Sequence, residues 1–205
     1  MKLYRARFST NVERVALALA HKGLSADSVW IEYSDRGPVE EISGQGLVPV
    51  LVDDDGTVHV ESMDIVRHLD ERHPEPPLYP ADPARREEML VFIDWFNAVW
   101  KVAPNAIEAE LGKADPDLEA VERHAARITG ALDRFEAMLA GRDHLMGDDF
   151  SAADIAAFPF LKYALIRDPE DDELFHRILE DRQPLGDRHP RLAAWIRRVG
   201  QYPRI

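Results

Sequence analysis

The sequence contains no cysteine. Disulfide bonds and thiolate metal sites are therefore excluded, and so is any chemistry that needs a thiol of the protein itself. Basic residues are also scarce, because 25 Lys and Arg stand against 38 Asp and Glu, which gives a formal net charge of −13. Nucleic acids and anionic membranes repel such an anion, so we expect neither as the principal partner.

Long apolar runs are missing as well. No uninterrupted run approaches the roughly 18 residues of a transmembrane helix, so we expect no membrane span. The first residues, MKLYRARFSTN, contain arginines and no apolar core segment, so we expect no secretory signal and a cytoplasmic location. The content of 45% hydrophobic residues in 205 supports a folded core, in one large domain or two small ones.

The stretch 46–64, GLVPVLVDDDGTVHVESMD, carries the clearest local pattern. Two short apolar runs, Val50–Val52 and Val58–Val60, flank an acidic turn at 53–56 that ends in glycine, which predicts a β-hairpin. Pro49 stands at the first residue of the first strand, where a missing backbone N–H is tolerated.

A helix is predicted directly after this hairpin, over about residues 62–73. Ser62 stands where the helix must begin, and such a residue favours that position by accepting hydrogen bonds from unpaired backbone N–H groups. A helix start beside the carboxylate of Glu61 can hold both ends of an amino-acid-like ligand. The alternative is a plain hairpin followed by a capped helix with no ligand.

The order of elements before residue 75 is strand, helix, strand, loop or short helix, hairpin and helix. A helical crossover implies parallel strands and a hairpin implies antiparallel ones, so we predict a mixed sheet in the thioredoxin-like order. The predicted segments are a strand at 2–7, a helix from Val12 to Lys22-Gly23, a strand at 29–33, a possible turn of helix at 39–42, the hairpin and the helix at 62–73.

The segment 74–84, PEPPLYPADPA, contains five prolines and marks the best domain boundary. We predict a thioredoxin-like domain at 1–76, a linker at 77–85 and an all-helical domain at 86–205. In the second domain the expected helices are 85–111, which Pro104 should kink or break, then 117–139, 151–166, 172–182 and 190–200.

Ser151-Ala152-Ala153-Asp154 precedes the unusually apolar stretch IAAFPFLKYAL. A serine at the N-cap and an acid three residues later form a variant of the capping box, and such a cap is typically worth about 1 kcal/mol. We interpret this motif as structural, because a helix this apolar is buried and its end needs partners.

Val48-Pro49 followed by Glu61-Ser62 resembles the glutathione site of the cytosolic glutathione transferases, and the residues before and within the 151–154 motif resemble the signature of their helical domain. The resemblance implies that Pro49 is cis, that Val48 pairs its backbone with the cysteinyl part of glutathione, and that Glu61 and Ser62 hold the γ-glutamyl end. It also implies a homodimer.

The same resemblance implies that the protein lowers the pKa of the glutathione thiol, so that the thiolate attacks a small hydrophobic electrophile. Ser9 occupies the position of the thiol-activating residue, and Asn11 is the second candidate because a Thr-x-Asn arrangement serves in some bacterial classes. Thr10 lies between them. The alternative is that Ser9 or Thr10 only caps the following helix, and Tyr4 is a weaker rival as thiol donor.

Arg36 and Gln45 are the candidates for holding the glycyl carboxylate. In the family, Asn97 and Trp100 would line the second-substrate site between the domains, although a stripe of aromatic residues at helical spacing is more often plain core. Ser43-Gly44-Gln45 replaces the more usual Asn-Pro sequence of the family, which leaves the identity of the thiol open.

We predict a glutathione transferase. Its rivals are a glutathione-dependent isomerase or disulfide reductase and, in another class, a non-catalytic ligand-binding or protein-interaction module of the same fold. No metal is expected, because the turn at 53–56 lacks the pattern of a calcium loop and the eight histidines show no ligand spacing.

Overall fold

The structure is a computed structural model that describes residues 1–205. The chain forms two compact units. Unit 1 comprises Met1–Tyr79 and the last residues, Tyr202–Ile205, and unit 2 comprises Pro80–Gln201. No helix in either unit has the length and apolar character that crossing a membrane requires.

Unit 1 is built on a four-stranded mixed sheet in the order β2-β1-β3-β4. Strand β1 is parallel to β2 and antiparallel to β3, and β3 and β4 form the predicted hairpin. The elements of the unit are β1 (Lys2–Arg5), α1 (Thr10–His21), β2 (Asp27–Trp30), α2 (Gly37–Ser43), β3 (Val50–Val52), β4 (Val58–His59) and α3 (Ser62–Arg72).

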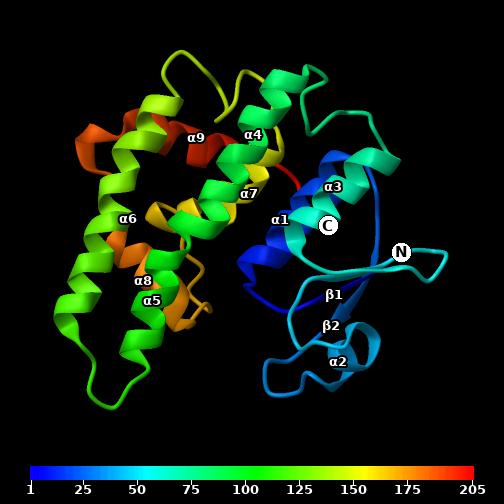
Figure 1. The fold of residues 1–205 in the computed structure, drawn as a ribbon, viewed down its shortest axis with the longest axis horizontal. Coiled ribbons are helices and arrows are strands. Elements are labelled where there is room, and N and C mark those ends of the chain that lie inside the picture. Colours follow the sequence, from blue (N-terminus) through cyan, green and yellow to red (C-terminus); the bar gives the residue numbers. More distant parts are fainter. The chain divides into compact units, whose positions relative to one another are not determined.

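Alternation along the strands separates two apolar faces. Tyr4 and Val50 are paired in register and belong to a small cluster that includes Val39 of α2. Leu3 and Leu51 are the neighbouring pair, so their side chains point to the other face, and both are fully buried. Helices α1 and α3 lie side by side on that face, and α2 lies on the opposite one (Figure 1).

A buried ion pair ties the ends of α1 and α3 together. The Lys22 ammonium, fully buried after the last turn of α1, contacts the Asp70 carboxylate and the backbone oxygen of Pro76. Asp70 also accepts the backbone N–H of Leu78 at 2.8 Å. This cluster fixes the chain where it leaves α3.

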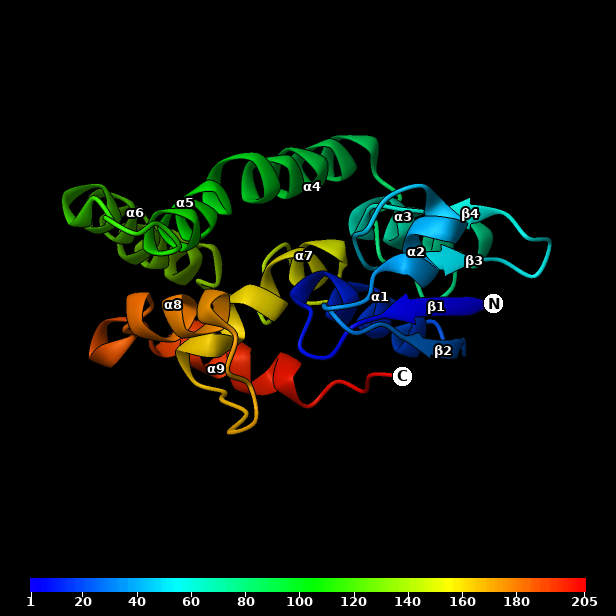
Figure 2. The ribbon, with the colours of Figure 1, turned by 90° about the horizontal axis from the view of Figure 1, so that it is seen from below.

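Unit 2 is entirely helical, as predicted. Its first helices form one long bent column, with α6 packed beside α5 (Figures 1 and 2). The elements are α4 (Pro83–Trp95), the π-helical segment η1 (Phe96–Trp100), α5 (Val102–Leu111), α6 (Leu118–Met138), α7 (Ala152–Leu161), the 3₁₀ turn η2 (Lys162–Ala164), α8 (Leu174–Arg182), the 3₁₀ turn η3 (Gly186–Arg188) and α9 (Pro190–Gly200).

The predicted break near Pro104 is present, but it lies one turn earlier. Pro104 has no N–H to offer Trp100, four residues before it, so the regular ladder cannot continue through this point. The chain widens into the π-helical turn η1, where the N–H of Lys101 donates to Phe96 over 3.0 Å. Pro104 itself is buried within the first turn of α5.

Helix α7 forms the centre of unit 2, and every one of its residues is buried. The predicted capping box opens it: Asp154 Oδ2 accepts the N–H of Ser151 at 3.0 Å and its hydroxyl at 2.9 Å. Asp154 Oδ1 accepts the N–H of Leu145 at 3.0 Å and Trp195 Nε1 at 2.8 Å. Burial raises the pKa of this carboxyl, while the four hydrogen bonds favour its ionised form.

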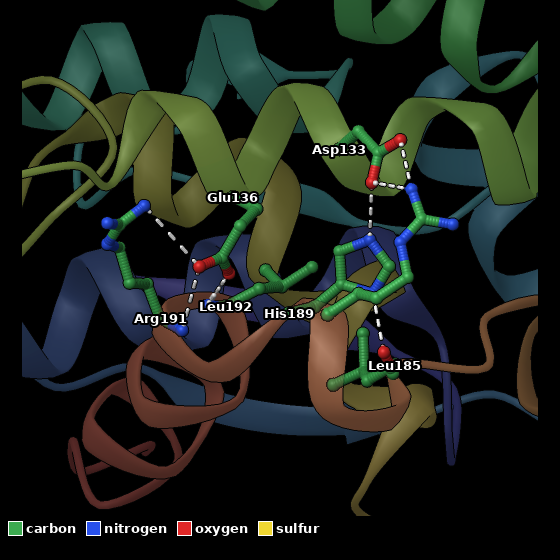
Figure 3. Close-up of polar contacts among 7 residues, drawn as sticks. Asp133, Glu136, Leu185, His189, Arg191 and Leu192 are labelled. Atoms are coloured by element: carbon green, nitrogen blue, oxygen red, sulfur yellow. Dashed lines mark hydrogen bonds and ion pairs between the residues drawn. The ribbon is translucent and has the colours of Figure 1, made fainter.

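Two acidic side chains of α6 hold the start of α9, as Figure 3 shows. Asp133 accepts from His189 Nε2 at 2.9 Å. Glu136 accepts the backbone N–H groups of Arg191 at 3.2 Å and Leu192 at 2.9 Å. No side chain of α9 caps its own start, so Glu136 provides that cap from a neighbouring helix.

Candidate active site

The ends of three strands lie together at one end of the sheet of unit 1. The register pairs Tyr4 with Val50 and Leu51 with His59. The end of β1, the start of β3 and the end of β4 therefore lie together. The loops at this end carry most of the site residues predicted from the sequence, and two of these loops lead into the N-termini of α1 and α3.

The residue two positions before β3 has backbone groups that are not used within the chain. The Val48-Pro49 peptide bond is cis, which confirms the expectation from the resemblance. Neither the N–H nor the C=O of Val48 makes a hydrogen bond in the structure, and its side chain is half-buried. A ligand with a peptide backbone can pair with both groups.

Arg36 and Gln45 brace this loop from within. Arg36 Nη1 donates to the carbonyl oxygen of Gly46 at 2.6 Å. The Gln45 amide bonds with both the N–H and the C=O of Leu47. Both side chains thus fix the approach to Val48, and the second N–H of the Gln45 amide is still available for a carboxylate.

The start of α3 differs from the prediction in one respect. Glu61 is the N-cap residue, and neither its side chain nor that of Ser62 caps the helix. The Ser62 hydroxyl oxygen instead accepts from Arg14 Nη1 at 3.3 Å. The expectation that Ser62 would cap α3 is wrong, because the N-cap position is Glu61 and Ser62 is already the first residue of the helix. The Glu61 carboxylate is exposed and available to a ligand ammonium group.

Ser9 and Asn11 both lie at the start of α1, at the same end of the sheet. Ser9 is the N-cap, and its hydroxyl oxygen accepts the N–H of Val12 at 3.3 Å. This contact uses a lone pair, so the hydroxyl hydrogen can still be donated to a ligand. Asn11 Oδ1 accepts from Arg14 Nη1 at 3.3 Å, and Thr10 is buried. Tyr4 lies within β1, half-buried against the α2 side of the sheet.

Arg14 is a buried residue of this region that the sequence patterns did not indicate. Its guanidinium is 2% exposed and contacts Asn11 of α1 and Ser62 of α3. Burial lowers the pKa of Arg14 to about 9, so the group is still charged at neutral pH. A buried cation beneath two helix N-termini favours an anionic ligand there. The available signal was a charged residue flanked by Val12 and Val15 on an otherwise apolar helix.

Two residues in this region have unusual backbone angles. Phe8 has φ of 61° and Glu61 has φ of 63°, and they are the only residues other than glycine with positive φ. Each stands directly before a serine of the candidate site. A bulky side chain at positive φ is costly, and such positions gather at functional sites when the surrounding structure holds them in place.

The residues predicted for the second substrate belong to unit 2. Trp100 is 4% exposed, and its ring stacks on Phe96 with a centroid distance of 4.6 Å. It also meets Phe135 and Phe160 edge-on, so its position favours the packing role weighed in the sequence analysis. Asn97 is half-buried in the same π-helical turn.

Comparison with known proteins identifies the family of both units. The family model described as the glutathione S-transferase N-terminal domain matches residues 3–77, and that of the C-terminal domain matches residues 104–198. The chain is 30% identical over 161 residues to the glutathione S-transferase GstB of Escherichia coli, covering 75% of this chain and 77% of that protein.

Two further relatives are similar over 70% and 72% of this chain. FtsZ-localized protein A of Caulobacter vibrioides is 30% identical over 155 residues, which cover 70% of this chain and 68% of the relative. Glutathione S-transferase omega-1 of mouse is 26% identical over 150 residues. That match covers 72% of this chain and only 62% of the mouse protein's length.

Among solved structures, a glutathione S-transferase from Rhodospirillum rubrum superposes with a TM-score of 0.76 at 26% identity. The match covers 98% of this chain and 88% of that one.

Proposed function

Because the chain belongs to the glutathione S-transferase family, we propose that it binds glutathione in unit 1 and activates its thiol for attack on a small hydrophobic electrophile. The observation that carries the proposal is the unpaired backbone of Val48 beside cis-Pro49, at the same sheet end as the two helix starts.

Each part of glutathione has a partner of matching chemistry in this proposal. The N–H and C=O of Val48 pair with the cysteinyl backbone. The Glu61 carboxylate takes the γ-glutamyl ammonium group, and the N-terminus of α3 with Ser62 takes the carboxylate beside it. Arg36 is the first candidate for the glycyl carboxylate, and the second N–H of the Gln45 amide is the other, because the rest of that amide bonds with Leu47.

The proposed chemistry begins with loss of the thiol proton to solvent. Ser9 donates its hydroxyl hydrogen to the thiolate, with Asn11 as a second contact. The thiolate then forms a carbon–sulfur bond with the electrophile. Either a leaving group departs with the bonding pair, or the electron pair moves onto the electrophile, which takes up a proton from solvent.

The interactions available at Ser9 are strong enough to lower the pKa of the glutathione thiol appreciably. A free thiol has a pKa near 8.5, and one unit corresponds to about 1.4 kcal/mol. A hydrogen bond to a charged group contributes about 1.5–3 kcal/mol, and a helix N-terminus adds about 0.3–1 kcal/mol. Ser9 at the start of α1 can therefore lower the thiol pKa by roughly one to two units.

The experiment is calorimetric titration of the purified protein with glutathione, comparing Glu61→Gln with the control Glu71→Gln. Glu71 is an exposed acid on the same helix, so both variants remove one charge from α3. We expect the Glu61 variant to bind at least tenfold more weakly and the Glu71 variant to bind as the parent does. Equal binding by the two variants would contradict the assignment of Glu61.

The role of Ser9 is tested with one variant that lacks its hydroxyl and one that keeps it. Ser9→Ala removes the cap and the donor, whereas Ser9→Thr keeps both. We expect the absorbance of the bound thiolate to titrate one to two pH units higher in Ser9→Ala and near the parent value in Ser9→Thr. Asp82→Ala removes the side-chain cap of α4 in unit 2 and serves as the capping control. An unchanged thiol pKa in Ser9→Ala would assign activation to Asn11.

A second candidate function is a binding module without catalysis. The relative named FtsZ-localized protein A favours it, since that name describes localisation with another protein and no reaction. Absence of glutathione binding at millimolar concentration would support this candidate over the transferase. Turnover of model electrophiles, or glutathione-dependent isomerisation or disulfide reduction, would decide among the catalytic alternatives.

A further inference from the structure

The side chains of two histidines and an aspartate lie close together between the hairpin of unit 1 and helix α3. Asp53 follows β3, His59 ends β4, and His68 lies on α3. One ligand atom from each residue lies within 4.8 Å of the other two. The spacing of the three residues along the chain does not predict a metal site, and no metal was expected here.

The fold explains why these residues meet. The hairpin register pairs Leu51 with His59 and Val52 with Val58, and the N–H of Asp53 donates to the C=O of Thr57. Asp53 and His59 are therefore diagonal neighbours on the same face of the hairpin. Helix α3 then runs back across the sheet and places His68 over the hairpin. The imidazole rings of the two histidines stack with centroids 3.8 Å apart and an interplanar angle of 26°.

Both histidines direct Nε2 toward the same carboxylate oxygen. Asp53 Oδ2 lies 2.9 Å from Nε2 of His68 and 3.3 Å from Nε2 of His59. The contact with His59 is not aligned as a hydrogen bond, and this buried nitrogen has no hydrogen-bond partner. A buried polar atom without a partner costs about 1–3 kcal/mol, so the arrangement calls for an explanation.

We propose that Asp53, His59 and His68 bind a divalent transition-metal ion such as Zn²⁺. Imidazole nitrogen and carboxylate oxygen are ligands that Zn²⁺ accepts, at bond lengths of about 2.0–2.2 Å. Such bonds in a tetrahedral site separate the ligand atoms by about 3.3 Å, close to the two distances at Asp53 Oδ2. A water molecule completes the coordination.

The chemistry of the ligand set narrows the choice of ion. Two neutral imidazoles favour Zn²⁺, Co²⁺, Ni²⁺ or Cu²⁺, whereas Ca²⁺ and Mg²⁺ prefer a shell of oxygen atoms. The side chains are largely sheltered, with exposed fractions of 8% for Asp53, 20% for His59 and 22% for His68. They are covered enough to hold an ion firmly and open enough to admit it.

The bound ion would act as a structural cross-link. It would join both strands of the hairpin to α3, whose N-terminus carries Glu61 and Ser62. Imidazoles coordinate a metal only in their neutral form, so insertion of the ion supplies a partner to His59 Nε2 that no side chain supplies. The stacked rings must tilt apart slightly, so that each nitrogen lone pair points at the ion.

The test is calorimetric titration of the full-length protein with Zn²⁺ after treatment with EDTA and removal of the chelator. We expect one saturable site per chain, with affinity lowered at least tenfold in His68→Ala and in Asp53→Asn. His73→Ala is the matched control, because His73 is an exposed histidine that follows the same helix, and it should bind as the parent does. Binding that the three variants leave equal would overturn the proposal.

A spectroscopic measurement on the unmodified chain protects the test against a variant that fails to fold. Co²⁺ in a tetrahedral site of nitrogen and oxygen ligands gives visible d–d bands, and Zn²⁺ should displace it with one equivalent. Thermal unfolding should shift upward with added Zn²⁺ in the parent and not in His68→Ala. Absence of both the bands and the shift would mean that the cluster is only a hydrogen-bonded brace. None of these measurements involves glutathione, so the outcome is independent of the proposed function.

Discussion

Replacing Asp154 should destabilise unit 2 more than any surface substitution. Its carboxylate is fully buried and accepts four hydrogen bonds. Three of the donors cannot turn away: the N–H groups of Leu145 and Ser151, and Nε1 of Trp195. In Asp154→Ala these three donors lose their acceptor in a region without solvent.

The size of the effect follows from the number of donors. Each buried donor left without a partner costs about 1–3 kcal/mol, so Asp154→Ala should lose about 3–9 kcal/mol. Asp154→Asn can turn its amide NH₂ toward Ser151, whose hydroxyl can accept, and keep its oxygen toward Leu145 and Trp195. It loses the bond from the N–H of Ser151 and the charge on the remaining acceptor, about 2–4 kcal/mol in total.

Urea unfolding followed by tryptophan fluorescence measures this loss, because Trp95, Trp100 and Trp195 belong to unit 2 and only Trp30 to unit 1. We expect the order of stability to be parent, Asp154→Asn and Asp154→Ala. Asp149→Asn, an exposed acid nearby in the same loop, should leave the midpoint unchanged. The reasoning is refuted if Asp154→Asn unfolds at the same urea concentration as Asp149→Asn.

Two further changes test other buried polar contacts. Lys22→Met leaves the Asp70 carboxylate without its cation in the interior and should cost about 3–5 kcal/mol in urea unfolding, whereas the double variant with Asp70→Asn keeps an acceptor for the N–H of Leu78 and should recover part of the loss; no recovery would mean that the cost is one of packing. Glu136→Ala leaves the first N–H groups of α9 without their acceptor and should cost about 0.5–2 kcal/mol, with Glu136→Gln intermediate. Equal midpoints for the Ala and Gln variants would show that the cap contributes nothing.

Local patterns predicted the elements whose partners are close in the chain. The hairpin at 46–64 and the cap formed by Ser151 and Asp154 depend on residues within a few positions of one another, so their geometry follows from spacing. The cis bond at Pro49 was predicted only from the family resemblance. Local sequence does not predict it, because only about 5–6% of X-Pro bonds in folded proteins are cis.

Contacts between distant elements could not be derived in this way. The pairing of Arg14 with Ser62 joins residues 48 positions apart, and it overturned the expected cap at α3. Nothing in the spacing of Asp53, His59 and His68 shows their convergence, which needs both the hairpin register and the path of α3. Trp100 likewise has the same helical spacing whether it lines a site or fills a core.

The two helix starts of the candidate site are connected by contacts within unit 1. Phe8 and Glu61 hold positive φ angles, so packing within unit 1 must compensate for their backbone strain. Arg14 supplies part of that compensation by joining the start of α1 to the start of α3. Because Arg14 contacts both Asn11 and Ser62, its replacement should disturb the two helix starts together, although they are far apart in the sequence.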